Sequence, residues 1–242
     1  MKAVKCADVV RSVGPPAAGN EGSALRRRRS GVHATTRDRI RDMIVRGDLP
    51  SGELINEMDL CRTLAVSRTP IREALKVLAA EGLVELLPNR GSQVRSPTHT
   101  EIRNLFGVIA ALERLAAETV AADANADKLA SLRALHDQML AHYGRRDRAG
   151  YFDLNHRIHE TIIELAGNAE LTRTHADLMT RARRPRFIAI TSETRWDESV
   201  KEHELIMAAM ETGDSRYAGE LLFRHVLKTG TAYLASLHPA IA

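Results

Sequence analysis

The chain has 242 residues, of which 44% are hydrophobic, 27% charged and only 4% aromatic, and its formal net charge is +4. This length suffices for one large or two smaller domains, each with its own core, and so few aromatic rings argue against a stacking platform for single-stranded nucleic acid. The two cysteines, Cys6 and Cys61, make neither a disulfide framework nor a zinc cluster. Because the chain has no apolar run of about 18 residues and no apolar leader, we expect a cytoplasmic protein that makes no contact with a membrane.

Positive charge is concentrated toward the N-terminus. Residues 26–96 carry fourteen Lys or Arg and nine Asp or Glu, whereas residues 97–242 carry eighteen and twenty. Residues 1–29 are rich in Gly, Ala, Pro and Arg without periodicity, which predicts a disordered basic tail. The run Arg26–Arg29 at its end either contacts phosphates or is a solvated linker.

Residues 30–97 are expected to form one small domain. Apolar spacing predicts a first helix that starts near Thr35 and stops at Gly47, and a short second helix over about 57–64. A third helix begins after a cap at Ser67 or Thr69 and ends at Glu81-Gly82. Residues 83–87 and 92–95 then predict a short hairpin around the turn 88–91. Three helices followed by a hairpin are typical of a winged helix-turn-helix.

The exposed side of the third helix carries a basic stripe. Arg68, Arg72 and Lys76 are four residues apart, on the side opposite the apolar positions of the same helix. Such a stripe can bind bases or phosphates in the major groove, although on a single helix it is more often a solvated face. The order of helix, turn, stripe and hairpin favours DNA binding. Gly91 at the hairpin tip would let the backbone approach a sugar-phosphate ridge.

Residues 98–242 predict an all-helical antiparallel bundle. The expected helices cover about 99–122, 126–144, 148–166, 169–192, 196–212 and 214–236, separated by Gly, Asn and Asp breakers and by a break near Thr194. The fold class is therefore mostly α, with a bundle of six or seven helices behind the winged domain.

Three of these helices carry polar residues on apolar stripes. Asn155 and His159 share a face of one helix, His203 lies on another and His225 on the last. Buried imidazoles need partners, and neutral imidazole is a common ligand of divalent metals. Spacing alone leaves two alternatives, a metal site or separately satisfied core histidines. The other histidines fit no converging set and are expected at the surface or behind the ligands: His33, His99, His136, His142, His156, His175 and His238.

The first domain resembles the GntR family of bacterial regulators. The resemblance rests on Gly47–Gly52, Leu54 and Glu57, on the run Val66–Leu75, and on Leu78, Glu81–Val84 and Pro88–Ser92. It implies that Arg68, Thr69 and Arg72 read or position DNA, with Lys76 beside them, and that Arg90 and Gly91 form the wing contact. Met58 departs from members that carry an arginine there, so that contact is missing or is made by Arg62.

The second domain resembles the FCD effector domain of FadR-type GntR regulators. The matching residues are Leu112-Glu113, Asn155 through His159 to Gly167-Asn168, Glu202-His203, Ala209, Gly213-Asp214 and His225. The resemblance implies a divalent metal (zinc, nickel, iron or manganese) held by Asn155, His159, His203 and His225, and a small carboxylate effector. Six helices favour the VanR-like variant.

Two positions depart from this pattern. Asn155 stands where many members have Asp, which should lower metal affinity. Ile109 replaces an arginine that could hold the effector carboxylate, and Arg181 and Arg184 are the weak candidates to substitute for it.

The expected function is a homodimeric regulator, a repressor by its resemblance, whose affinity for a two-fold symmetric operator changes when the effector binds. One alternative is a metal-dependent enzyme acting on a small carboxylate, but the converging set offers no general base and the chain shows no nucleophile motif. The other is a helical scaffold that binds only protein, which would leave the basic stripe and the wing unexplained.

Overall fold

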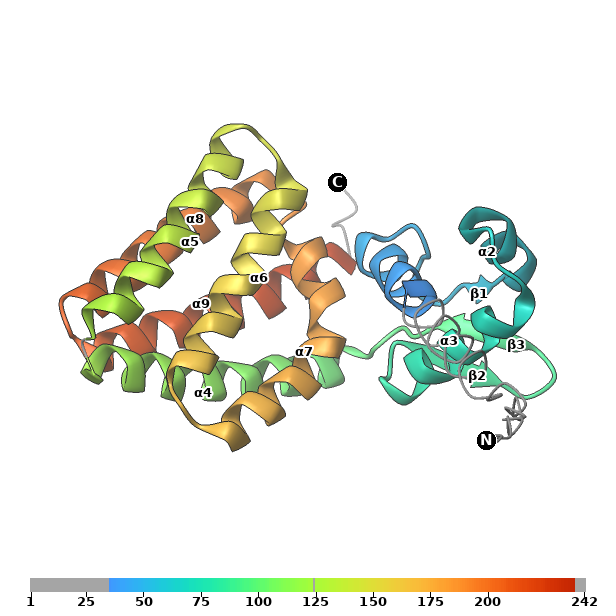
Figure 1. The fold of residues 1–242 in the computed structure, drawn as a ribbon, viewed down its shortest axis with the longest axis horizontal. Coiled ribbons are helices and arrows are strands. Elements are labelled where there is room, and N and C mark those ends of the chain that lie inside the picture. The colour runs from blue at the N-terminus through green and yellow to red at the C-terminus, as the bar shows by residue number, and fades with distance from the viewer. Residues whose placement is uncertain (1–34, 124, 238–242) are drawn as a thin grey trace, which may run out of the picture.

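The computed structural model describes residues 35–123 and 125–237, which form two bodies joined at one end of a long helix (Figure 1). The expected tail, residues 1–29, lies outside the described residues, as do Cys6, His33 and His238. None of the described helices is both long and apolar enough to cross a membrane.

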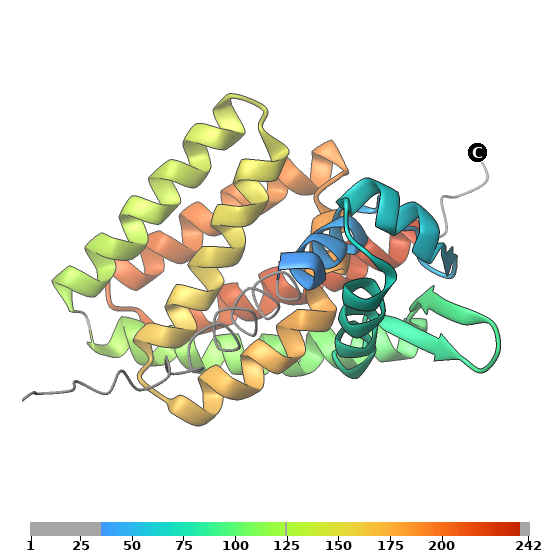
Figure 2. The ribbon, with the colours of Figure 1, turned by 45° about the vertical axis from the view of Figure 1, so that its right-hand side comes forward.

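The smaller body is the winged helix-turn-helix. A first helix (residues 35–46) precedes β1 (Leu54–Ile55), α2 (Glu57–Leu64), α3 (Arg68–Ala80), β2 (Val84–Leu87) and β3 (Gly91–Val94). Its core is one apolar cluster, to which α3 contributes Ile71, Ala74, Leu75 and Leu78. The hairpin β2–β3 projects away from the bundle (Figure 2).

Local chemistry sets the ends of α2. The side chain of Asn56 accepts hydrogen bonds from the backbone of Met58 and Asp59, which caps the helix start. Ala65 ends α2 in the left-handed region with φ +55°, and Ser67 occupies the cap position of α3. Three residues, 65–67, therefore suffice to turn the chain from the bracing helix into the recognition helix.

The sheet has one strand more than the sequence predicted. Strand β1 pairs antiparallel with β3, with Leu54 opposite Gln93 and Ile55 opposite Ser92, so the order is β1-β3-β2. Two residues are too short for a period-two pattern to be recognised. Only Ile55 is buried, whereas Leu54 is exposed.

The larger body contains six helices in the described part of the chain. They are α4 (His99–Asp123), α5 (Ala126–Gly144), α6 (Arg148–Leu165), α7 (Ala169–Ala189), α8 (Glu193–Glu211) and α9 (Ser215–Leu237). A capping box starts α4, because Thr98 Oγ1 accepts from the Glu101 backbone while the Glu101 carboxylate accepts from the Thr98 backbone.

The boundary between α7 and α8 differs from the expectation. Helix α8 begins at Glu193, three residues earlier than predicted, because the Ser192 side chain accepts from the backbone of Arg195 and caps it. The break that was expected near Thr194 lies at residues 190–192. The shift brings Arg195 into the first turn of α8, where it is buried.

Candidate functional sites

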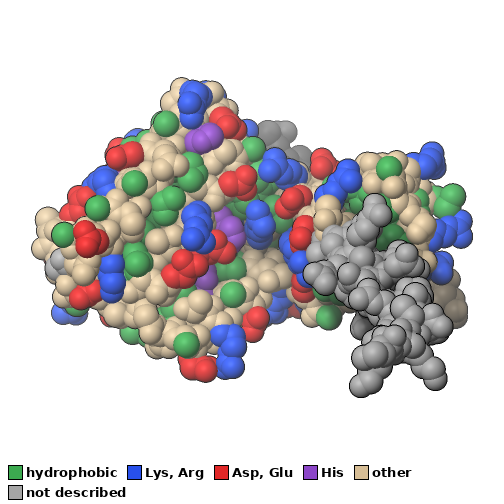
Figure 3. Space-filling model, viewed as in Figure 1, with side chains coloured by type: hydrophobic (Ala, Val, Ile, Leu, Met, Phe, Trp, Pro, Cys, Tyr) green, Lys and Arg blue, Asp and Glu red, His purple; other side chains and the backbone are tan. Residues whose placement is uncertain are grey.

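The recognition helix presents its predicted residues to solvent. Arg68, Thr69, Arg72 and Lys76 are all exposed at the start and along one side of α3, and Arg90 and Gly91 are exposed at the hairpin tip. Lys and Arg side chains stand out at the end of this body that faces away from the bundle (Figure 3). The face is free to enter a groove, because the apolar side of α3 is turned inward.

Neighbours on α2 hold two of these arginines. Arg72 Nε donates to the Glu57 carboxylate at 2.9 Å, and Arg68 Nη2 lies 2.7 Å from the Met58 sulfur. Met58, which replaces an arginine in the resemblance, therefore contacts Arg68. Arg62 pairs with Asp59 on its own helix. Exposed pairs of this kind contribute little free energy, so phosphates can replace the carboxylates at small cost.

In the bundle, three histidines from three helices meet. His159 of α6, His203 of α8 and His225 of α9 each offer a ring nitrogen within 4.8 Å of the others, and all three are buried. The Nε2 atoms of His159 and His203 are buried without a hydrogen-bond partner among the described residues. Orphaned imidazole nitrogens that converge are a donor set suited to a divalent metal.

Two carboxylates lie behind this cluster. His159 Nδ1 contacts the Glu113 carboxylate of α4, and His225 Nδ1 contacts Glu202 at 2.7 Å. A carboxylate on the distal nitrogen fixes the tautomer and leaves the other nitrogen for a metal. No carboxylate was expected in the converging set, and Glu113 and Glu202 contact its histidines from outside it.

Glu113 is fully buried and has three partners. Besides His159, it accepts from His175 Nε2 at 3.0 Å and from Arg186 Nη1 at 3.3 Å. Burial by itself would raise the pKa of Glu113, but these partners hold that pKa well below its usual range. Burial, followed by the charge of Arg186, lowers the pKa of His159 to about 3. The pair is therefore a carboxylate and a neutral imidazole.

The other two rings are also neutral. Burial lowers the pKa of His203 well below its ordinary value and also lowers that of His225. For Glu202, burial opposes ionisation, but hydrogen bonds from His225 and Lys228 and the charge of Arg195 lower the pKa to about 2. Neutral imidazoles keep the lone pairs that metal coordination requires.

The remaining predicted residues lie in two places. Asn155 is buried one turn before His159, and its Oδ1 lies 3.4 Å from Arg186 Nη2. Arg181 and Arg184 line a cavity between the two bodies rather than the histidine cluster. The buried arginines next to the cluster are Arg186 and Arg195, which the sequence analysis did not single out.

Two of the remaining histidines are buried. His175 contacts Glu113, which also contacts His159 of the cluster. This is one of the two positions that were expected for it, behind the cluster rather than at the surface. His136 does not lie at the surface, because it is fully buried on α5, and its ring nitrogens have no hydrogen-bond partner within the described ranges.

A winged helix-turn-helix joined to a helical bundle defines a DNA-binding regulator of two domains. Comparison with known proteins supports this class of protein. Residues 32–94 match "Bacterial regulatory proteins, gntR family" and residues 104–228 match "FCD domain". The chain belongs to the GntR family and carries an FCD domain. It is a DNA-binding transcriptional regulator, and its relatives are regulators rather than enzymes.

Individual relatives extend over both domains. The chain is 29% identical over 206 residues to the probable D-xylose utilization operon transcriptional repressor of Paenarthrobacter nicotinovorans, covering 85% of this chain and 90% of that one. It is 25% identical to the HTH-type transcriptional regulator YdhC of Bacillus subtilis, covering 78% and 84%. The structure of McbR/YncC from E. coli superposes with a TM-score of 0.71 at 17% identity, covering 86% and 98%, which shows the fold.

Proposed function

We propose that this regulator is a homodimeric, cytoplasmic repressor. Its FCD domain holds one divalent metal and a small carboxylate effector, and effector binding lowers the affinity for a two-fold symmetric operator. The observation that carries the metal is the pair of orphaned, buried Nε2 atoms of His159 and His203, together with the carboxylates that orient His159 and His225. Repression is inferred from relatives named as repressors.

The proposed ligands are His159, His203 and His225, with Asn155 as a fourth, weaker donor. An amide oxygen carries no charge, so the site has no anionic ligand to balance a divalent ion. Zinc, nickel, iron and manganese all accept imidazole and oxygen donors, and the imidazole-rich set favours the first three over manganese. A metal bound here would act as a Lewis acid that attracts an anionic oxygen.

Two buried arginines are proposed to bind the effector carboxylate. Arg195 places Nη2 2.8 Å from Glu202, yet its Nε and Nη1 are buried and have no hydrogen-bond partner among residues 35–123 and 125–237. A guanidinium with unused donors beside the histidine cluster suits a carboxylate. Arg186 shares its donors between Glu113 and Asn155.

The metal proposal is tested by titrating metal-free protein with zinc against a chromophoric chelator. We expect one equivalent to bind per chain, and His203→Gln to weaken binding by more than about 100-fold. Glu202→Gln, which removes only the partner of His225, should weaken it by about 10- to 100-fold. His142→Gln on α5 is the matched control. Equal zinc affinity in the wild type and in His203→Gln would reject the site.

The DNA proposal is tested by measuring binding to the chain's own upstream region at fixed salt, with scrambled competitor. Arg68→Ala and Arg72→Ala should each weaken specific binding by about 1–3 kcal/mol, because each removes a base or phosphate contact from α3. Arg173→Ala, an exposed arginine of α7, should leave binding unchanged. Specific affinity that survives both α3 substitutions would contradict this assignment.

The same assay identifies the effector. Small carboxylates are added to the bound complex, with and without zinc, and release is recorded. Arg195→Gln should abolish release while leaving operator affinity without effector at the wild-type value, because Arg195 lies in the bundle, far along the chain from α3. Release that is unchanged in Arg195→Gln would remove this residue from the effector site.

A further inference from the structure

The end of the first helix is docked onto the bundle. Val45, in its last turn, is buried at 2% exposure and belongs to the apolar core of the larger body. Arg46 lies 3.8 Å from Asp153 of α6, which also lies 3.7 Å from Arg183 of α7. The DNA-binding domain is therefore attached to α6 and α7 as well as through the linker to α4.

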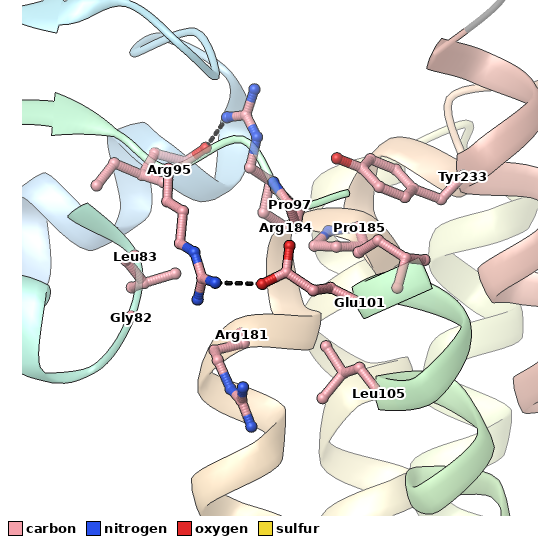
Figure 4. Close-up of a pocket in the computed structure, with 12 residues that line it drawn as sticks. Gly82, Leu83, Arg95, Pro97, Glu101, Leu105, Arg181, Arg184, Pro185 and Tyr233 are labelled. Carbon is pink, nitrogen blue, oxygen red and sulfur yellow. Dashed lines mark hydrogen bonds and ion pairs between the residues drawn. The ribbon is translucent and has the colours of Figure 1, made fainter. Parts of the chain in front are cut away.

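Arg184 completes this attachment through backbone groups. Its Nη1 donates to the carbonyl oxygens of Ile44 and Leu49, at 3.2 Å in the second case. Figure 4 shows Arg184 among the side chains at the junction of the two bodies. Carbonyls in the last turn of a helix have no partner within the helix, and a cation there also interacts favourably with the helix dipole. Arg184 of the sensory domain thus caps a helix of the DNA-binding domain.

The same two helices reach the histidine cluster with their opposite faces. Residues two apart on an α-helix point about 200° from one another. On α7, Arg184 faces the first helix and Arg186 faces Glu113 and Asn155. On α6, Asp153 faces Arg46 and Asn155 faces Arg186. One layer of two helices therefore separates the proposed metal site from the DNA-binding domain.

This layer has room to move. A cavity of about 60 Å³ lies at the junction, lined by residues of both bodies that include Gly82, Arg95, Glu101, Arg184 and Tyr233. That volume exceeds the space needed for one water molecule, so the contact is not close-packed. Pro185, between the two arginines, also removes one backbone hydrogen bond from α7.

We propose that Arg184 is the positioning residue through which the state of the histidine site sets the placement of the DNA-binding domain. A ligand that binds Asn155 breaks its contact with Arg186, and α7 is then held differently at this point. Arg184 lies two residues earlier on α7, so its position relative to the carbonyls of Ile44 and Leu49 changes as well. This inference rests on the proposed function for the identity of the ligand, but the mechanical link between Asn155 and the first helix does not.

Hydrogen exchange of the full chain tests the link. The amides of Gly47 and Leu49 close the first helix by bonding to Met43, so their exchange reports on its end. In Arg184→Gln we expect these amides to exchange about 10-fold faster, because a charge-assisted hydrogen bond is lost. Arg173→Gln, on the same helix but away from the junction, should exchange like the wild type. Equal exchange in Arg184→Gln and wild type would overturn the proposal.

Two further experiments test whether a change at the histidine site reaches the first helix. Saturating zinc should change exchange at Gly47 and Leu49 in the wild type but not in Arg184→Gln, although both bind zinc equally. Independently of metal, Asn155→Ala should alter the same amides, and this effect should disappear in the double variant with Arg184→Gln. If the wild type binds no zinc, the proposed function fails and the Asn155 arm alone decides the link. If the effects of Asn155→Ala and Arg184→Gln on amide exchange are additive in the double variant, the proposed link is overturned.

Discussion

Lowering the pH from 7 to 5 should remove about 2 kcal/mol from the unfolding free energy of the metal-free protein for each histidine that stays neutral in the folded state. His159, His203 and His225 are neutral in the folded state, because burial depresses their pKa values. In the unfolded chain each titrates near its ordinary value of about 6.5. Below that pH the unfolded state takes up protons that the folded state does not. For His159, whose folded pKa is about 3, this amounts to about 2 kcal/mol by pH 5.

The unfolding free energy falls as the pH is lowered, because the pKa values of these histidines are lower in the folded state than in the unfolded state. The contribution of these histidines to the unfolding free energy is constant above about pH 7 and falls as the pH drops through 6.5. For His159 it continues to fall until the pH reaches its folded pKa of about 3. Urea unfolding in the presence of EDTA at several pH values measures the slope. His203→Gln should reduce the slope by about one proton, and His142→Gln should serve as its control. A free energy that does not change between pH 7 and 5 would refute this account.

The second large effect concerns Glu113. Replacing it with Gln should destabilise the protein by about 3–5 kcal/mol, because Arg186 would keep its charge in a buried site without a counter-charge. His159 and His175 would also lose the carboxylate that accepts from them. Thermal and urea unfolding of the full chain measure the loss.

A matched control lies on the same helix. Glu118 pairs with Arg114 at the surface of α4, so Glu118→Gln should cost no more than about 1 kcal/mol. If Glu113→Gln remains folded, its zinc affinity should also fall, since His159 is no longer held in one tautomer. A cost for Glu113→Gln equal to that of Glu118→Gln would show that the buried cluster does not contribute as described.

Much of the fold could be predicted because it is encoded locally. Helix-breaking residues predicted the observed bounds of α5, and the recognition helix and hairpin were predicted from their order and turn residues. The apolar stripes left open whether His159, His203 and His225 converge or are satisfied separately, and the resemblance to FCD domains favoured the convergence that the structure has. Strand β1 and the start of α8 were missed, since one is two residues long and the other depends on a single cap at Ser192.

The neighbours of the histidines were harder to predict, for different reasons. Glu113 carried a usable signal, because it lies between Ile109 and Ala116 on the apolar face of α4, as the histidines do on theirs. Arg186 had none. The arginines of α7 follow one another closely, and only the position of Glu113, 73 residues earlier, decides which of them turns inward. Pairing over such a distance leaves no periodic trace in the sequence.

Because α4 is long, a small tilt of this helix displaces its first residues by a large distance. Four residues separate it from β3, and Glu113 lies fourteen residues after its first residue, His99. At 1.5 Å per residue this arm is about 21 Å long, so a tilt of about 5° around Glu113 displaces the start of the helix by about 2 Å. Hydrogen bonds to base edges tolerate only a few tenths of an ångström. A movement too small to disturb the packing around the buried carboxylate is therefore large enough to take the wing and the recognition helix out of register with a DNA groove.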